Sequence, residues 1–308
     1  RDADRRDQPG LLEDLALARK LFSEGKATQN LRRYIGVERP PKSLDLLCST
    51  TALEEAVSPG LTPLARWPGP HRNSLVLLQQ AAVNLAFRET KGSGLLGING
   101  PPGTGKTTLL RDLVAGIVAN RAEAMAKFAD PGEAFEHSGE KLRVGDGWLH
   151  LYRLNKSLRG FEMVVASSNN KAVENVSAEI PGLSAIADDA PELRYFKTLS
   201  DALHQSETWG SIAAVLGNVR NRSRFKQNFW WDEDNGLNSY LRAAAGSEVT
   251  ITDPETGERR APHIVKTEQP PLNREEALAR WKRAQKRFLS ALDKSRQWQT
   301  RLEGLRND

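Results

Sequence analysis

The chain has 308 residues, of which 39% are hydrophobic and 27% are charged, a composition typical of a soluble protein with a packed core. A single cysteine, Cys48, excludes an internal disulfide framework and favours a reducing compartment such as the cytoplasm, and no apolar run approaches the roughly 18 residues of a membrane span. The 44 Lys and Arg residues exceed the 39 Asp and Glu residues, and the net charge of +5 permits binding to a polyanion without requiring it.

Residues 1–66 are predicted to form a helical N-terminal accessory segment. Its first helix is expected over residues 9–25, where apolar side chains share one face and a glycine ends the helix. The Pro- and Gly-rich segment 67–70 marks the boundary with the next domain. A second helix is then expected over residues 74–88, with Ser74 as its N-cap.

A glycine-rich phosphate-binding loop follows a short apolar strand predicted at residues 95–98. The residues expected to bind the nucleotide there are Gly100, Pro101, Pro102, Gly103, Thr104, Gly105, Lys106, Thr107 and Thr108. The order of strand, glycine loop and helix, with the spacing G-x-x-x-x-G-K-[ST], predicts binding of nucleotide phosphates. Backbone N–H groups of the loop and the positive end of the helix dipole favour an anion. Lys106 is placed to reach the β- and γ-phosphates and is the catalytic candidate, and Thr107 is placed to bind Mg²⁺.

The loop belongs to a predicted ATPase core over residues 67–199. An insertion with strand character is expected at about 121–160, especially at 148–154, where aromatic and aliphatic residues are frequent. A second core strand is expected at 161–166 and a helix at 171–180. Because strands alternate with helices, the predicted fold class is α/β with a parallel sheet.

A second insertion is predicted over residues 200–272. It contains the segment 220–231, in which basic and aromatic residues alternate, and an expected hairpin at 249–265. The basic and aromatic segment suits a grip on phosphates and unpaired bases, and it suits equally a surface loop whose tryptophans pack on the protein.

The last predicted element is a long amphipathic helix over residues 273–308, in which Asn273 is the N-cap and Glu276 completes a capping box. Its apolar residues recur at near-heptad spacing, which is typical both of half a coiled coil and of a helix lying on a core. The chain starts at Arg1 and ends inside this helix, so we expect a fragment of a longer protein.

The surroundings of the loop discriminate between classes of phosphate-loop protein. A GTPase needs an Asn-Lys-x-Asp motif to recognise guanine, whereas Asn-Lys at 170–171 continues with Ala-Val. An AAA-type ATPase needs an apolar strand ending in Asp-Glu roughly 50–60 residues after the loop lysine, where this chain has MVVASSNN. Asp-Glu at 232–233 follows Phe-Trp-Trp, but bulky tryptophans are unsuited to a buried parallel strand.

Three motifs together resemble those of superfamily 1 helicases, in the branch that includes RNA-decay and DNA-replication helicases. They are LVLLQQAAV at 75–83, similar to the Q motif, GPPGTGKT at 100–107, similar to motif I, and VVASSNNKAVEN at 164–175, similar to motif Ia. Ser167 replaces the usual proline of motif Ia. The resemblance covers roughly residues 67–182.

This resemblance implies a RecA-like parallel sheet core, ATP and Mg²⁺ as cofactors, and single-stranded DNA or RNA as partner. Gln79, with Gln80 as its rival, matches the glutamine that binds the adenine edge, and Ser168 and Asn169 match residues that contact the nucleic-acid backbone. We therefore expect the parent protein to be an ATP-dependent helicase or translocase.

The acidic Walker B pair, the arginine finger and the second RecA-like domain of that family are not found in the sequence. The isolated chain is therefore expected to hydrolyse little ATP. An ATP-driven switch or remodelling ATPase, and a nucleotide-binding module without turnover, are the alternatives. The sequence does not decide between DNA and RNA.

Overall fold

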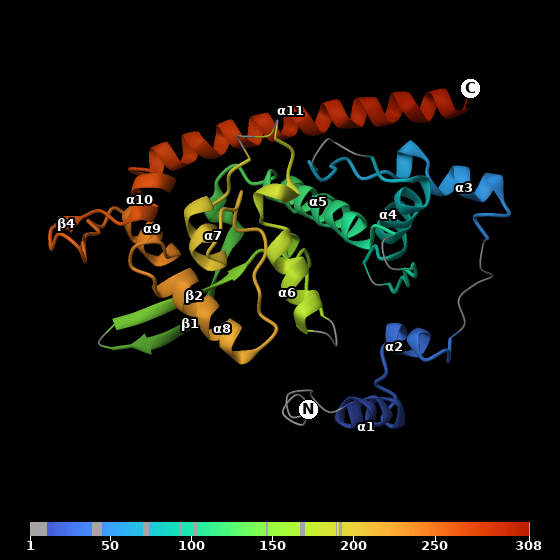
Figure 1. Cartoon of the computed structure of the whole chain (residues 1–308), viewed down its shortest axis with the longest axis horizontal. Coiled ribbons are helices and arrows are strands. Elements are labelled where there is room, and N and C mark those ends of the chain that lie inside the picture. Colours follow the sequence, from blue (N-terminus) through green and yellow to red (C-terminus); the bar gives the residue numbers. More distant parts are fainter. Residues whose placement is uncertain are drawn as a thin grey trace. The chain divides into compact units, whose positions relative to one another are not determined.

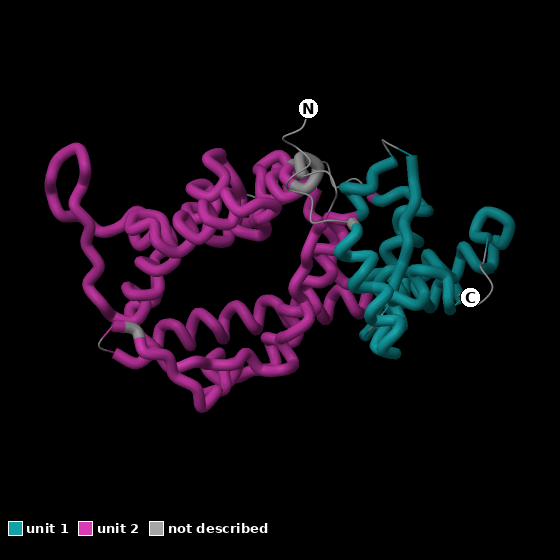
Figure 2. Tube along the Cα trace, turned by 90° about the horizontal axis from the view of Figure 1, so that it is seen from below, with its two compact units in different colours: residues 1–63, 75–109, 299–308 teal, residues 64–74, 110–298 magenta. Residues whose placement is uncertain are grey.

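The computed structural model of the chain describes residues 11–38, 45–69, 74–92, 94–101, 104–145, 147–166, 170–188, 190 and 193–307. Helices predominate among these residues, and the strands form two small antiparallel sheets (Figure 1). The chain divides into two compact units, coloured in Figure 2. Unit 1 comprises residues 1–63, 75–109 and 299–308, and unit 2 comprises residues 64–74 and 110–298.

Unit 1 is helical in its described part and contains the predicted phosphate-binding loop. Its elements are α1 (Leu11–Ser23), α2 (Gln29–Tyr34), α3 (Thr50–Ala56), the 3-10 helix η1 (Pro59–Leu61), α4 (Leu77–Glu89), the start of α5 (Lys106–Met125) and the end of α11 (Arg274–Asn307). Helices α1 and α4 confirm the two helices predicted before the loop. Ala81 and Val83 of α4 are almost fully buried, because they pack in the core of this unit.

A buried amide ties α4 to α3. The side chain of Asn84 is completely buried, and its Nδ2 donates to the carbonyl of Ala56 at 3.0 Å. Gln299 of α11 similarly donates through Nε2 to the carbonyls of Pro59 and Thr62, at 2.8 Å each. These bonds satisfy backbone groups near η1 that water would otherwise bind.

Unit 2 contains both sheets and the remaining helices. Its elements are most of α5, the 3-10 helix η3 (Pro131–Ala134), β1 (Phe135–Val144), β2 (Gly147–Leu154), the 3-10 helix η4 (Lys156–Leu158), α6 (Asn170–Glu179), the 3-10 helix η5 (Leu183–Ala185), α7 (Lys197–His204), α8 (Val219–Lys226), the π-helical η6 (Gln227–Trp231), α9 (Leu237–Ala244), β3 (Ile251–Thr252), β4 (Arg259–Arg260), α10 (His263–Glu268) and most of α11.

The core of unit 2 includes the contact between α7 and α10. Leu199 and Ile264 are 1% and 0% exposed. Helix α11 lies against the end of α5 in this unit, because Trp281 Nε1 donates to the carbonyl of Phe128 at 3.0 Å and Gln285 Nε2 donates to that of Ala126 at 2.7 Å. Within unit 2, α11 therefore behaves as a helix lying on a core.

The β1–β2 hairpin confirms the strand predicted in the first insertion. Its strands are antiparallel, with Phe135 opposite Leu154 at one end and Val144 opposite Gly147 at the other. The register shifts between His137 and Lys141, where β1 contains a bulge. Strands β3 and β4 form the second, two-residue ladder.

The parallel sheet predicted from segments 95–98 and 161–166 is not found among the described residues. Both segments are described, and neither pairs with a strand. Their apolar side chains remain accessible, with Leu95 50% and Val164 91% exposed. The described residues thus form a mixed α/β structure, and these two apolar runs lack the neighbour that would accept and donate ladder hydrogen bonds.

Two local predictions also change. Helix α4 begins at Leu77, not after Ser74, because Gln79 Oε1 accepts from the Val76 N–H at 3.1 Å and caps the helix there. The second half of the expected hairpin is helix α10, whose first residue, His263, donates its backbone N–H to Asp234 Oδ1 at 2.6 Å.

The N-terminus of α11 follows the prediction with one difference. The Glu276 N–H donates to Asn273 Oδ1 at 2.9 Å, which confirms the N-cap. The Glu276 carboxylate, however, accepts from the Leu272 N–H at 2.8 Å instead of that of Asn273.

Candidate nucleotide-binding site

The described residues of the predicted phosphate-binding loop are non-helical, and the loop is followed directly by α5. Pro101 and Thr104 are exposed, and Lys106 is the first residue of the helix. Gly105 has a φ of +74°, a conformation that L-residues with a Cβ rarely adopt. Pro102 and Gly103 lie outside the described residues.

At two loop glycines a polar side chain lies where a Cβ would be. A Cβ on Gly100 would lie 2.7 Å from Thr104 Oγ1, and a Cβ on Gly105 would lie 2.3 Å from Gln79 Nε2. A side chain at either glycine would displace the neighbouring polar side chain.

Lys106 folds back over the loop. Its Nζ donates to the carbonyls of Gly100 and Pro101, at 2.7 and 2.8 Å. The side chain is exposed, so the ammonium group stays accessible to an anion entering the loop.

The first turn of α5 offers backbone donors beside this ammonium group. The backbone N–H groups of Lys106, Thr107 and Thr108 have no acceptor among the described residues, whereas that of Leu109 donates to the Gly105 carbonyl at 3.1 Å. Unpaired N–H groups at the start of a helix carry its positive dipole end and bind anions. The donors and the lysine together have the chemistry of a phosphate site.

Gln79 connects α4 to the loop, whereas Gln80, the other candidate for adenine recognition, does not. Its Nε2 donates to the Thr104 carbonyl at 2.8 Å, while its Oε1 caps α4. Gln80 instead donates to the buried Asn84 Oδ1 at 2.7 Å, so its amide belongs to the core contact between α3 and α4. Among the two candidates for adenine recognition, Gln79 is the one at the loop.

Thr107 and Thr108 have different environments. Thr107 is half-buried and makes no side-chain hydrogen bond to a described residue, so its hydroxyl is available as a ligand. Thr108 is exposed, and its Oγ1 is 3.6 Å from the position of a Cβ on Gly105. In the described part of the chain no group of three or more His, Cys, Asp or Glu side chains is arranged to hold a metal ion.

The nucleic-acid candidates Ser168 and Asn169 lie outside the described residues. The helix that follows them, α6, is described, and its Glu174 accepts from Asn221 Nδ2 at 3.0 Å. This bond joins the motif Ia-like segment to the basic and aromatic segment of the second insertion. Sequence reasoning missed the link because nothing in either segment signals a partner 47 residues away.

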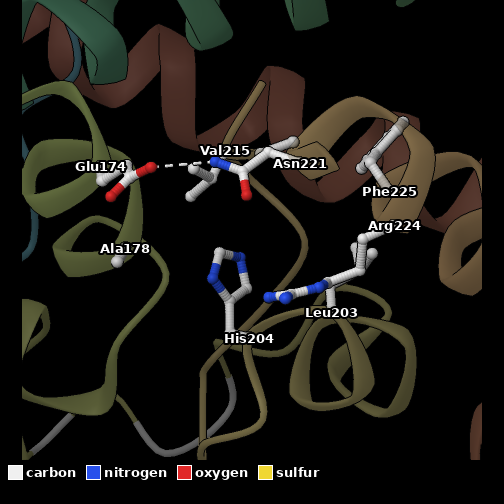
Figure 3. Close-up of a pocket in the computed structure, with 9 residues that line it drawn as sticks. Glu174, Ala178, Leu203, His204, Val215, Asn221, Arg224 and Phe225 are labelled. Atoms are coloured by element: carbon white, nitrogen blue, oxygen red, sulfur yellow. Dashed lines mark hydrogen bonds between the residues drawn. The ribbon is translucent and has the colours of Figure 1, made fainter. Parts of the chain in front are cut away.

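A pocket of about 300 Å³ lies beside this bond (Figure 3). Its lining residues are Glu174, Ala178, Leu203, His204, Ala214, Val215, Asn221, Arg224 and Phe225. Figure 3 shows the side chain of Arg224 extending towards the His204 ring. Burial lowers the pKa of His204 below its ordinary value of 6.5, although a hydrogen bond to the Ala213 carbonyl and the charge of Asp201 act in the opposite direction. His204 is therefore a neutral, polar group at neutral pH.

Asp232, the acidic candidate after Phe-Trp-Trp, does not follow a strand. Residues 227–231 form a π-helical segment, and Asp232 Oδ1 accepts from the backbone N–H groups of Asp234 and Asn235 at 2.9 and 2.8 Å. The carboxylate thus caps its own turn, in agreement with the expectation that these tryptophans do not form a buried parallel strand.

Comparisons of the chain with models of protein families, with curated proteins and with solved structures returned no match. Within the described ranges, none of the helices combines the length and apolar character that crossing a membrane requires.

Proposed function

We propose that the chain binds Mg·ATP through its phosphate-binding loop, and that it is the nucleotide-binding part of a superfamily 1-type helicase or translocase acting on single-stranded nucleic acid. One observation carries the nucleotide part of the proposal. The Lys106 ammonium group contacts the Gly100 and Pro101 carbonyls, and the N–H groups that begin α5 next to it have no acceptor among the described residues. These are the donors that a polyphosphate needs, and the exposed loop leaves them accessible.

The roles of the residues follow from their chemistry. Lys106 would exchange its contacts with the Gly100 and Pro101 carbonyls for contacts with phosphate oxygens. Thr107 would supply a hydroxyl oxygen to the metal, and Gln79 would hold the loop against α4 and present its amide to the adenine edge. When bound, Mg·ATP supplies a transferable phosphoryl group whose charge the metal spreads.

The proposal includes a RecA-like parallel sheet in the parent protein. Segments 95–98 and 161–166 are apolar, exposed, and each is followed by a described helix, α5 or α6. Pairing with further strands would remove those side chains from water, at about 25 cal/mol per Å² of apolar surface. This gain is the physical support for assigning both segments to a sheet.

A second candidate, a nucleotide-binding module without turnover, is favoured by the environment of Asp232. Its carboxylate is bound to two backbone N–H groups of its own turn, so it is poorly placed to orient water or metal. A helicase function then requires that the acidic residues needed for hydrolysis come from outside these 308 residues.

Titration with ATP and with adenosine in the presence of Mg²⁺ tests the proposal. Lys106→Ala should weaken ATP binding by about 10- to 100-fold, since hydrogen bonds to charged groups contribute about 1.5–3 kcal/mol. Adenosine, which lacks phosphates, should bind the variant as it binds the wild type. Lys91→Ala, which removes an exposed lysine of the same unit, is the matched control and should change neither affinity. A wild-type chain that fails to bind ATP more tightly than adenosine refutes the proposal.

A further inference from the structure

The register of the β1–β2 hairpin gathers aromatic and basic side chains on one face. Paired residues of antiparallel strands lie on the same side of the ladder, and alternate residues share that side. The residues of this aromatic–basic face are Phe135, His137, Lys141 and Arg143 of β1, and Trp148, His150, Tyr152 and Leu154 of β2. No acidic residue belongs to this set, because Glu136 pairs with Arg153 on the opposite face.

The large aromatic side chains of this face are unusually accessible. Trp148 is 57% exposed, Tyr152 61% and Phe135 57%. Full burial of a large apolar side chain stabilises a protein by about 1.5–3 kcal/mol. The three exposed aromatic side chains of this hairpin do not contribute this stabilisation. Exposed aromatic groups that gather in one patch mark an interaction surface.

Contacts along the face already order its side chains. Lys141 Nζ lies 4.5 Å from the centre of the Trp148 ring. A ring nitrogen of His137 lies 3.0 Å from one of His150, and the Tyr152 ring meets His137 edge-on at 5.3 Å. Binding to this face therefore immobilises fewer free side chains than binding to a surface without such contacts.

Among the described residues, the cations of this face have no carboxylate partner. No described carboxylate forms an ion pair with Lys141 or Arg143. On the opposite face, by contrast, Arg153 pairs with Glu140 at 2.9 Å. The positive charge is thus available on the side that presents the aromatic rings.

We propose that the aromatic–basic face binds single-stranded nucleic acid. Trp148 and Tyr152 stack on unpaired bases, and Lys141 and Arg143 contact the phosphates. The combination of accessible rings and uncompensated cations on one face, without acids, is complementary to this polyanion and to its exposed bases. The choice of partner rests on the proposed function, whereas the location of the surface rests on the hairpin alone.

Fluorescence anisotropy with labelled 20-residue oligo(dT) and oligo(U) tests the stacking part. The double variant Trp148→Ala, Tyr152→Ala should weaken binding by at least about 30-fold, because each of the two lost base stacks contributes about 1–3 kcal/mol. The control is Leu142→Ala, Leu149→Ala, which removes two side chains of the opposite face that are 54% exposed each. The control should bind within about twofold of the wild type, and both variants should keep the wild-type circular dichroism spectrum.

The salt dependence of binding tests the phosphate part. Each lost phosphate contact lowers the slope of log K against log salt by about 0.7 for a single strand. Lys141→Ala, Arg143→Ala should therefore reduce the slope by about 1.4, and Arg153→Ala should leave it unchanged. Equal slopes for both variants overturn this assignment.

Further arms separate this inference from the proposed function. Lys106→Ala should lose ATP affinity yet bind the oligonucleotides through Trp148 and Tyr152 as the wild type does. If the wild-type chain binds ATP but no oligonucleotide, the inference is refuted and nucleotide binding is unaffected. The same holds if the variant without Trp148 and Tyr152 binds the oligonucleotide as tightly as the wild type does. The inference is also refuted if the aromatic–basic face binds vesicles of phosphatidylcholine and phosphatidylserine but does not bind the oligonucleotides.

Discussion

Gln79 lies where helix α4 meets the predicted phosphate-binding loop, and its two amide atoms have different partners. The carbonyl oxygen caps α4, and the amide nitrogen donates to Thr104. Recognition of adenine by this side chain requires the amide to be held at the loop, and the two bonds hold it there. Sequence spacing alone left Gln79 and Gln80 as rivals, because neighbours on a helix differ only in the direction of their side chains.

Replacement of Gln79 by alanine is predicted to reduce the preference for ATP over GTP. The loss of one hydrogen bond at about 1 kcal/mol corresponds to roughly fivefold in the ratio of the two affinities. Competition between the two nucleotides for a fluorescent analogue measures this ratio. Gln80→Ala should keep the ratio while lowering the melting temperature, since Gln80 bonds to the buried Asn84. Equal affinity of the wild-type chain for ATP and GTP would contradict the role given to Gln79.

Alanine at Gly105 is predicted to impair both the loop and its ligand. The residue has a φ of +74°, and a Cβ there would lie 2.3 Å from Gln79 Nε2. We expect a loss of about 1–2 kcal/mol in the free energy of unfolding, the typical cost of a left-handed conformation for a residue with a Cβ, together with weaker ATP binding. Gly97→Ala is the control, because a Cβ there meets nothing within 4 Å. Chemical denaturation and ATP titration of both variants test the prediction, which fails if they behave alike.

The helices and caps that were predicted correctly depend on local sequence. The strands that were predicted but not found depend on hydrogen-bond partners that are distant in the sequence. The helices at α1, α4, α5 and α6 follow from apolar periodicity, and the α11 N-cap follows from Asn273. The segments 95–98 and 161–166 have strand composition but no ladder partner among the described residues. Residues 263–265 resemble a strand, yet Asp234 receives their first N–H and starts a helix. A sequence pattern cannot identify the residue that completes such a bond from 29 positions away.

The β3–β4 hairpin depends on one arginine, and its titration is predicted to show this. Arg260 Nε donates to Asp253 Oδ2 at 2.7 Å, and this pairing is the largest cause of the lowering of the Asp253 pKa from 3.8 to about 2. The backbone N–H groups of Thr256 and Glu255 lower it further, and burial opposes them. Because the folded pKa lies below the unfolded one, the stabilisation is complete above about pH 4 and disappears as the pH falls towards 2.

Arg260→Ala should therefore raise the pKa of Asp253 towards 3.8, as measured by NMR titration of its carboxyl carbon. Arg259→Ala is a suitable control, because its guanidinium donates to the Thr250 hydroxyl instead of a carboxylate. An unchanged Asp253 titration in the Arg260 variant would show that the backbone donors alone lower the pKa.

For the whole molecule, the prediction concerns turnover. Hydrolysis needs an acid that holds the metal, an oriented water and usually an arginine finger, which alone contributes about 10³–10⁵ in rate. The loop supplies a lysine and a threonine, and Asp232 is engaged in its own turn. We expect the 308 residues to bind Mg·ATP with almost no phosphate release, with or without single-stranded nucleic acid.

Measurement of phosphate release by a coupled assay checks this expectation. Strong stimulation by a single strand would contradict it and would make Asp232 the leading candidate for the missing acid. Asp232→Asn should abolish the activity in that case, whereas Asp188→Asn, at an exposed position of the same unit, should not.

The self-contact of Lys106 has a thermodynamic consequence. The ammonium group already donates hydrogen bonds to two carbonyls of its own loop. Binding of the proposed phosphate would then be an exchange reaction, and its measured affinity would equal the free-energy difference between the contacts to phosphate and the contacts to the two carbonyls. In a Lys106→Arg variant, a planar guanidinium would have to donate to the same two carbonyl oxygens. The change in ATP affinity would then depend on the contacts in the nucleotide-free chain as much as on those in the complex.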